Sequence, residues 1–218
     1  MNTFIFDMDG VIVDSEYTYF KSKSDILHEA GHDVPVSYHY QFMGTTSDVM
    51  WQSMKDEFQL PGSIEDYGKE MNRRRGEIIQ KDGVQPIVHV QDLVKRLFDA
   101  GFKLGVASAS RKEEIIRNLK ELGLDSYFTQ AVSAEEVTHS KPEPDVFLHT
   151  AELLESDPSD CIVIEDTKNG TRAAKAAEMY CVGFANPDYP AQDLSCADEV
   201  IKDFREIDES WLTEKSKT

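Results

Sequence analysis

Several carboxylates in this chain directly follow apolar segments that have the composition of buried strands. Asp7 and Asp9 follow Thr3–Phe6, and Asp166 follows a similar segment, Cys161–Ile164. Carboxylates that gather in one place repel one another and need a bound cation, a shared proton or contact with water. Oxygen ligands without His or Cys suit Mg²⁺, which accepts one or two carboxylates together with a substrate phosphate. The residue types therefore favour a magnesium site.

The segments that must position these carboxylates alternate between strand-like and helical patterns. The predicted strands are Thr3–Phe6, Lys103–Ala107, Cys161–Ile164 and Val182–Ala185. Between most of them, apolar residues repeat at helical spacing, as at Leu93, Leu97 and Ala100. This alternation predicts an α/β fold, with a doubly wound, Rossmann-like parallel sheet covered by helices on both faces.

One edge of such a sheet would bring the polar residues together. The carboxyl ends of parallel strands share an edge, and doubly wound folds bind ligands there. Asp7, Ser108 and Asp166 each follow a predicted strand, so we expect them to converge although they are far apart in the sequence. Gly10 lets the backbone turn sharply after the two aspartates.

A long stretch without a convincing strand separates the first predicted strand from the others. Ser15–Ala30, Ser47–Phe58 and Ile64–Gln80 have helical patterns, and Gly31 closes the first of them. We therefore expect a helical cap domain inserted into the α/β core. The predicted domains are a core of residues 1–14 and 84–218 and a cap of residues 15–83.

Composition excludes several classes of partner. The chain has 218 residues, with 23 Lys and Arg against 41 Asp and Glu, and a net charge of −18. This charge repels nucleic acid and anionic membranes, and no apolar run approaches the roughly 20 residues of a membrane span. Cys161 and Cys181 lie in or beside apolar runs and indicate buried thiols in a reducing cytoplasm. We expect a monomer or a weak dimer.

Four short motifs together resemble the haloacid-dehalogenase-like superfamily of phosphotransferases. Asp7–Val11 is similar to its first motif, D-x-D-G-[VT], and Ser108 lies in a segment similar to the second. Lys141 occupies the third motif, and Glu165–Gly170 is similar to the fourth, E-D-[ST]-x-x-G. One such motif arises often by chance, whereas four in the right chain order rarely do. The resemblance covers nearly the whole chain, and the helical insert corresponds to the family's cap.

The resemblance implies a role for each carboxylate. Asp7 would be the nucleophile that forms an aspartyl-phosphate, and Asp9 would be the general acid and then the base that activates water. Mg²⁺ would be held by Asp7, by the backbone carbonyl of Asp9, and by Asp166, with Glu165 beside or just behind these ligands.

The resemblance also implies which residues would bind the phosphate and the rest of the substrate. Ser108 and the backbone N–H of Ala109 would hold phosphate oxygens. Lys141 would stabilise the transferring group and neutralise Asp7. Gly44 and Thr45 would belong to a cap loop that touches the substrate.

Within the superfamily, the resemblance is to helical-cap phosphatases and to β-phosphoglucomutase, whose core motifs are the same. The mutase pattern carries an Arg and a His where Ser47 and Tyr19 stand here, which favours a Mg²⁺-dependent phosphatase acting on a small sugar phosphate. β-Phosphoglucomutase activity is the alternative. A non-catalytic metabolite-binding protein is a third possibility, against which the complete set of motif residues argues.

Two other patterns look like binding motifs. His28 and His32 complete a match to the zinc-protease motif H-E-x-x-H, but Gly31 indicates that the helix ends between them. Arg73–Arg75 are roughly 100° apart around a helix, so we expect a solvated face rather than a nucleic-acid site. One of these three arginines is a candidate for recognising substrate charge, and the sequence does not distinguish which.

Overall fold

The structure, a computed structural model, describes residues 1–43 and 45–215. The chain divides into two compact units, one formed by Met1–Asp14 with Pro86–Thr218 and the other by Ser15–Gln85. We call the first unit the core and the second unit the insert.

The core is built on a parallel sheet. Its strands are β1 (Thr3–Phe6), β2 (Lys103–Ser108), β3 (Gln130–Ser133), β4 (Cys161–Glu165), β5 (Tyr180–Phe184) and β6 (Glu199–Ile201). Their order is β3-β2-β1-β4-β5-β6, and every neighbouring pair is parallel. The predicted α/β, doubly wound fold with an inserted helical region is confirmed. Because the chain runs outward on both sides of β1, the switch point of the sheet lies at its first strand.

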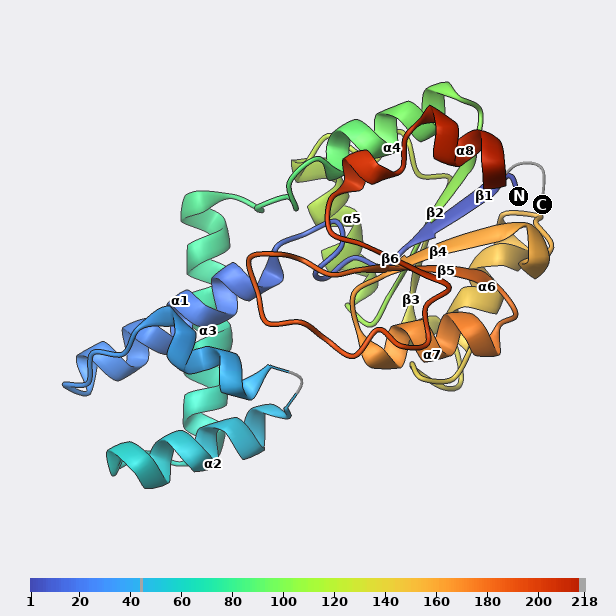
Figure 1. Ribbon diagram of the computed structural model, residues 1–218. Helices are drawn as coiled ribbons and strands as arrows, with labels where there is room; N and C mark the ends of the chain where they lie inside the picture. The colour runs from blue at the N-terminus through green and yellow to red at the C-terminus, as the bar shows by residue number, and fades with distance from the viewer. Residues whose placement is uncertain (44, 216–218) are drawn as a thin grey trace. The chain divides into compact units, whose positions relative to one another are not determined.

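Helices cover both faces of this sheet. The core helices are α4 (Val90–Asp99), α5 (Lys112–Glu121), α6 (Asp145–Leu153), α7 (Lys168–Ala176) and α8 (Glu209–Lys215). Short 3-10 turns lie at η2 (Ala134–Glu136), η3 (Pro158–Asp160) and η4 (Phe204–Glu206). Figure 1 shows α4 and α8 over one face and α6 and α7 over the other.

The first strand shows why the strand segments lack polar alternation. All four residues of β1 are buried. Ile5 packs into the cluster formed with α6 and α7, whereas the Phe4 ring lies 6.4 Å from that of Trp211 in α8. Successive side chains therefore enter opposite apolar layers, as a strand with helices on both sides requires.

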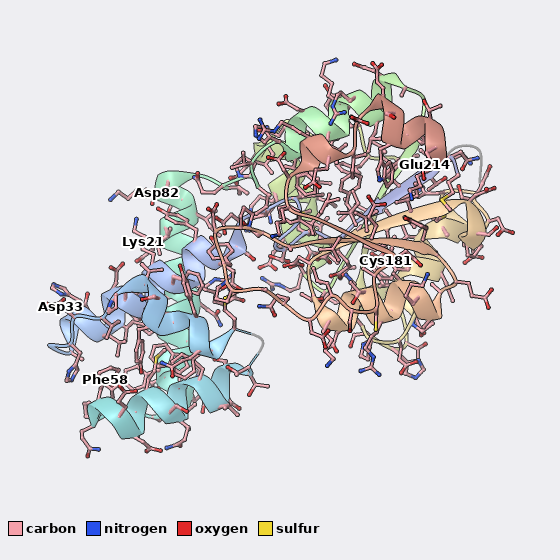
Figure 2. All side chains as sticks on the ribbon, viewed as in Figure 1. Lys21, Asp33, Phe58, Asp82, Cys181 and Glu214 are labelled. Carbon is pink, nitrogen blue, oxygen red and sulfur yellow. The ribbon has the colours of Figure 1, made fainter. Side chains whose placement is uncertain are left out.

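The insert is helical throughout its regular elements. It contains α1 (Ser15–Glu29), η1 (Val36–Phe42), α2 (Ser47–Phe58) and α3 (Ile64–Asp82). Met50, Trp51 and Met54 of α2 are buried in its core. Figure 2 shows Lys21 of α1 beside Asp82 at the end of α3, and their ion pair measures 2.8 Å. The insert therefore has its own hydrophobic core and its own ion pairs between helices.

The structure also tests the smaller predictions. α1 ends at Glu29, and His28 Nδ1 lies 2.6 Å from Asp33 Oδ1, so His28 and His32 do not share one helix. Cys161 and Cys181 are free and buried, as predicted. Within residues 1–43 and 45–215, no helix combines the length and hydropathy needed to cross a bilayer.

Candidate active site

The switch point of the sheet brings three polar chain segments to one edge. Phe6 at the end of β1 pairs with Val106 of β2 on one side and with Ile164 of β4 on the other. The Asp7 backbone N–H continues this pairing by donating to Ile164 O at 3.0 Å. The segments that follow β1, β2 and β4 therefore leave the sheet side by side.

Gly10 allows the first of these segments to turn tightly against the third. Its φ of +83° lies in the left-handed region, and its N–H donates to Val13 O at 2.8 Å. A Cβ at this position would lie 2.0 Å from Asp166 Oδ2. Only glycine therefore allows the turn after Asp9 to approach Asp166 so closely.

Lys141 joins two of the carboxylates. Its ammonium donates to Asp7 Oδ1 at 2.5 Å, to Glu165 Oε1 at 2.8 Å and to Ala107 O at 3.0 Å. These three bonds use all three ammonium protons. The Lys141 side chain is only 10% exposed, so it is not a solvated surface lysine. Although burial acts in the other direction, the charges of Asp7 and Glu165 raise the pKa of Lys141, which stays a cation.

Glu165 uses both of its oxygens within the protein. Oε1 accepts from Lys141, and Oε2 accepts from the Thr167 backbone N–H and hydroxyl, both at 2.9 Å. Thr167 in turn caps α7 by accepting from the Gly170 N–H at 3.0 Å. Glu165 therefore fixes the start of α7 and orients Lys141, and it has little capacity left for another ligand.

Asp166 differs from Glu165 because one of its oxygens is unused. Oδ1 is buried and has no hydrogen-bond partner among the described residues. Burial raises the pKa of Asp166 well above its ordinary value, and the charges of Glu165 and Asp7 add to this shift. Burial also raises the pKa of Asp7, where the charge of Lys141 opposes the shift. These carboxylates therefore favour a proton or a cation as a partner.

Hydrogen-bonded serines of the second motif contact Asp9. The Ser110 hydroxyl donates to Asp9 Oδ2 at 2.6 Å, and the Ser110 carbonyl accepts from the Ser133 hydroxyl at 2.8 Å. Ser108 Oγ accepts from the Ser110 N–H at 3.0 Å, which leaves the Ser108 hydroxyl proton free to donate. Ser108 is buried, whereas Ala109 is exposed at the end of β2.

The two predicted substrate residues of the cap belong to the segment of the insert. Gly44 lies outside the described residues. Thr45 belongs to the insert, where it is exposed and its hydroxyl donates to Phe42 O at 2.7 Å. The two remain candidates from the sequence alone.

Two residues of the site were not predicted from the sequence. Ser110 holds the Asp9 carboxylate, and Thr167 holds that of Glu165. Each lies two residues beyond the residue that begins its motif, Ser108 or Glu165, so a search for hydroxyl groups at that spacing would have identified both.

Gly170 provides a test of how tightly the site is packed. A Cβ at Gly170 would lie 1.7 Å from Glu165 Oε1, so we expect Gly170→Ala to lower the unfolding free energy by about 1–3 kcal/mol. The matched control is Gly76→Ala in α3, where an added Cβ meets nothing within 4 Å. This control should stabilise the protein by about 0.5–1 kcal/mol, as measured by urea unfolding. Equal effects of the two substitutions would contradict the close packing of Glu165 on α7.

The chain matches the model of a known protein family. Residues 4–184 match the model described as haloacid dehalogenase-like hydrolase. This range includes β1 except Thr3, all of β2 to β5, and every residue of the cluster described above.

Curated relatives match along most of this chain. Fructose-1-phosphate phosphatase YqaB of Escherichia coli is 33% identical over 82% of this chain and 93% of its own length. A phosphorylated carbohydrates phosphatase of Thermotoga maritima is 27% identical over 81% of this chain and 82% of its own. The longer Arabidopsis thaliana protein Suppressor of quenching 1 is 34% identical over 82% of this chain, which spans 17% of that protein.

A solved structure resembles the fold along nearly its whole length. It is a hydrolase from Deinococcus radiodurans, described with bound phosphate and sodium. It has a TM-score of 0.86 and 25% identity, covering 99% of this chain and 96% of the other.

Proposed function

Because the chain belongs to the haloacid dehalogenase-like hydrolase family, we propose that it is a Mg²⁺-dependent phosphatase that acts on a small sugar phosphate through an aspartyl-phosphate at Asp7. The observation that carries this proposal is the buried contact of the Lys141 ammonium with Asp7 and Glu165, together with an oxygen of the following residue, Asp166, that has no partner within residues 1–43 and 45–215. Two relatives that are named as phosphatases of phosphorylated carbohydrates support the substrate class.

The donor set fits the divalent metal that family membership implies. No group of three or more His, Cys, Asp and Glu side chains in the described residues is arranged to hold a metal ion. Magnesium needs fewer protein ligands, because it keeps several waters and takes one or two carboxylates. Asp7 and Asp166, together with the backbone carbonyl of Asp9, would hold it, and the buried Asp166 Oδ1 has no hydrogen-bond partner in the part of the chain that the structure describes. Bound there, the ion would neutralise charge on the phosphoryl group as it is transferred.

The protein's own groups account for both halves of the reaction. Lys141 holds Asp7 Oδ1 and so orients the carboxylate, one oxygen of which attacks phosphorus as the bond to the leaving oxygen breaks. Asp9 gives its proton to that leaving oxygen and then accepts a proton from water. The activated water attacks phosphorus, the bond to the Asp7 oxygen breaks, and phosphate leaves.

The serines of the second motif would bind the phosphate oxygens. Ser108 retains a hydroxyl proton to donate, because its oxygen already accepts from the Ser110 N–H. Ser110 meanwhile holds the Asp9 carboxylate, which positions the acid and base. Lys141 would supply the positive charge that developing phosphoryl oxygens require.

The direct test is phosphate release from a generic aryl phosphate and from a panel of sugar phosphates, with Mg²⁺ or with chelator. We expect release with Mg²⁺ only. Incubation with β-glucose 1-phosphate and a catalytic amount of glucose bisphosphate distinguishes a phosphatase from β-phosphoglucomutase, the alternative. A phosphatase gives glucose and phosphate. Accumulation of glucose 6-phosphate would contradict the hydrolase assignment.

Metal removal should make stability depend on pH. Asp166 has a raised pKa in the folded protein, so between its ordinary value of 3.8 and the raised value the folded state binds more protons than the unfolded state. The unfolding free energy in chelator should therefore fall as pH rises above 3.8 and through the raised pKa of Asp166. Added Mg²⁺ should restore stability more at high pH than at low pH, because its ligands must be ionised.

Urea unfolding at several pH values measures this dependence. The Asp166→Asn variant is the control, since it keeps the surface charges but removes the titrating group, and its slope should be smaller. A midpoint in chelator that rises with pH would be inconsistent with a buried Asp166 whose pKa is raised.

A further inference from the structure

A buried serine at the carboxyl end of β3 has no part in the reaction steps above. Ser133 is fully buried on an edge strand of the sheet, where it pairs in register with Ser108 of β2. Its hydroxyl donates to Ser110 O at 2.8 Å and accepts from the Glu135 N–H at 3.1 Å. Because serine has one hydroxyl proton, the donor of Ser133 is used entirely by Ser110.

The backbone of Ser110 is held on both sides. Its N–H donates to Ser108 Oγ at 3.0 Å, and its carbonyl accepts from the Ser133 hydroxyl. These two bonds fix the direction of the Ser110 side chain, whose hydroxyl donates to Asp9 Oδ2 at 2.6 Å. Ser133 therefore acts on Asp9 through Ser110.

The end of β3 is itself anchored to the loop that carries Ser110. The Ser133 N–H donates to Glu136 Oε1 at 2.7 Å, which closes a capping box around η2. Lys112, the first residue of α5, donates to the same Glu136 oxygen at 3.0 Å and also to Ala131 O. The loop between β2 and α5 thus contacts β3 and η2 through both Ser110 and Lys112, so this edge of the sheet is a firm support for the loop.

We propose that Ser133 is a positioning residue, which acts through Ser110 to hold the Asp9 carboxylate in its reactive orientation. Ser110 occupies Asp9 Oδ2, whereas Asp9 Oδ1 has no hydrogen-bond partner within residues 1–43 and 45–215. Oδ1 is therefore the oxygen left for the two proton transfers of Asp9. This inference deepens the proposed function, and its kinetic consequence rests on that function.

The consequence is large because proton transfer requires the acid or base within hydrogen-bond reach of the reacting atom. A displacement of about 1 Å can cost roughly 10²-fold in rate. Ser133→Ala frees the Ser110 carbonyl, so the Ser110 hydroxyl is no longer directed at Asp9. The variant should fold, because Glu135 is exposed and its freed N–H can bond to water.

The kinetic test uses 4-nitrophenyl phosphate with Mg²⁺, because this substrate separates the two steps. Its leaving group needs no proton, so the release of nitrophenol as Asp7 is phosphorylated does not need Asp9. Hydrolysis of the aspartyl-phosphate does need Asp9 as a base. In Ser133→Ala the first step should keep its rate constant, and the second, measured after removal of substrate, should slow by roughly 10–100-fold. General damage to phosphate or metal binding would slow the first step as well.

A measurement of thermal stability in chelator needs no turnover. It compares the Tm of the original protein, Ser110→Ala, Ser133→Ala and the double variant. If Ser133 directs Ser110 toward Asp9, Ser110→Ala should lower the Tm less in the Ser133→Ala background than in the original protein.

Ser156→Ala provides the matched control background for both measurements. Ser156 is a half-buried serine of the core, and its hydroxyl lies 2.7 Å from that of Thr3, the first residue of β1. It is therefore at the opposite end of β1 from the site. In the Ser156→Ala background, Ser110→Ala should keep its full effect on Tm, and both reaction steps should keep their rate constants.

The proposal is overturned if Ser110→Ala lowers the Tm equally in the original and Ser133→Ala backgrounds. It is also overturned if Ser133→Ala slows both reaction steps alike or slows neither. Failure of the proposed function has a different signature, because a protein inactive on every phosphate ester would refute the phosphatase assignment while the Tm comparison still tests the action of Ser133 on Asp9.

Discussion

Asp7→Asn should reduce phosphate release by at least roughly 10⁴-fold, because an amide is a far weaker nucleophile than the carboxylate it replaces. The measurement is initial rate on an aryl phosphate at saturating Mg²⁺. The fold should persist, because Asn has the shape of Asp and its side-chain oxygen can still accept from the Lys141 ammonium.

Asp99→Asn is the matched control for this prediction. This substitution makes the same chemical change at an exposed position of α4, where the Asp99 carboxylate is ion-paired with Lys95. Its activity should equal that of the original protein. An Asp7→Asn protein that is folded by circular dichroism and retains near-normal turnover would exclude nucleophilic catalysis by Asp7.

Lys141→Met should affect both activity and stability. It leaves the carboxylates of Asp7 and Glu165 buried without their shared cation, and breaking a buried ion pair costs about 3–5 kcal/mol of unfolding free energy. Loss of the charge that stabilises the transferring group should also lower the turnover number by about 10²–10³-fold. Urea unfolding in chelator and initial rates with Mg²⁺ measure the two effects separately.

Lys175→Met on α7 is the control for the stability effect. Lys175 also forms an ion pair, with Asp198 at 2.7 Å, but its side chain is 38% exposed. Such a pair contributes at most about 1 kcal/mol. Equal losses of unfolding free energy for Lys141→Met and Lys175→Met would show that the buried cluster is not held together by its charges.

The central strands could be predicted from the sequence because their composition is unambiguous. Thr3–Phe6 and Cys161–Ile164 are apolar on both faces, and the structure buries both segments completely. The edge strands could not be predicted in this way. β3 is the segment Gln130–Ser133, with polar residues at both ends, and β6 has three residues with Val200 exposed. Such short segments become strands only because a neighbouring strand supplies hydrogen bonds.

The same holds for the site: the order of the strands could be used to predict which residues converge, but the hydrogen-bond partners of those residues depend on packing and could not be predicted. The sheet-edge rule was sufficient to predict that Asp7 and Asp166 would approach each other. The choice of Ser110 as the partner of Asp9 depends on where the loop after β2 directs a hydroxyl. Likewise, Arg75 differs from Arg73 and Arg74 only through partners on α1 and α3. Helical periodicity carries no information about such partners.

Trapping the intermediate tests the central claim most directly. Asp9→Asn lacks the base that activates water, so with Mg²⁺ and an aryl phosphate, whose leaving group needs no acid, it should accumulate phosphate on Asp7. Acid quenching followed by borohydride reduction converts an aspartyl-phosphate to homoserine, which peptide mass spectrometry locates. We predict homoserine at position 7 and at no other aspartate. An unmodified Asp7 in protein that has released the aryl alcohol, or reduction at a different carboxylate, would contradict the account.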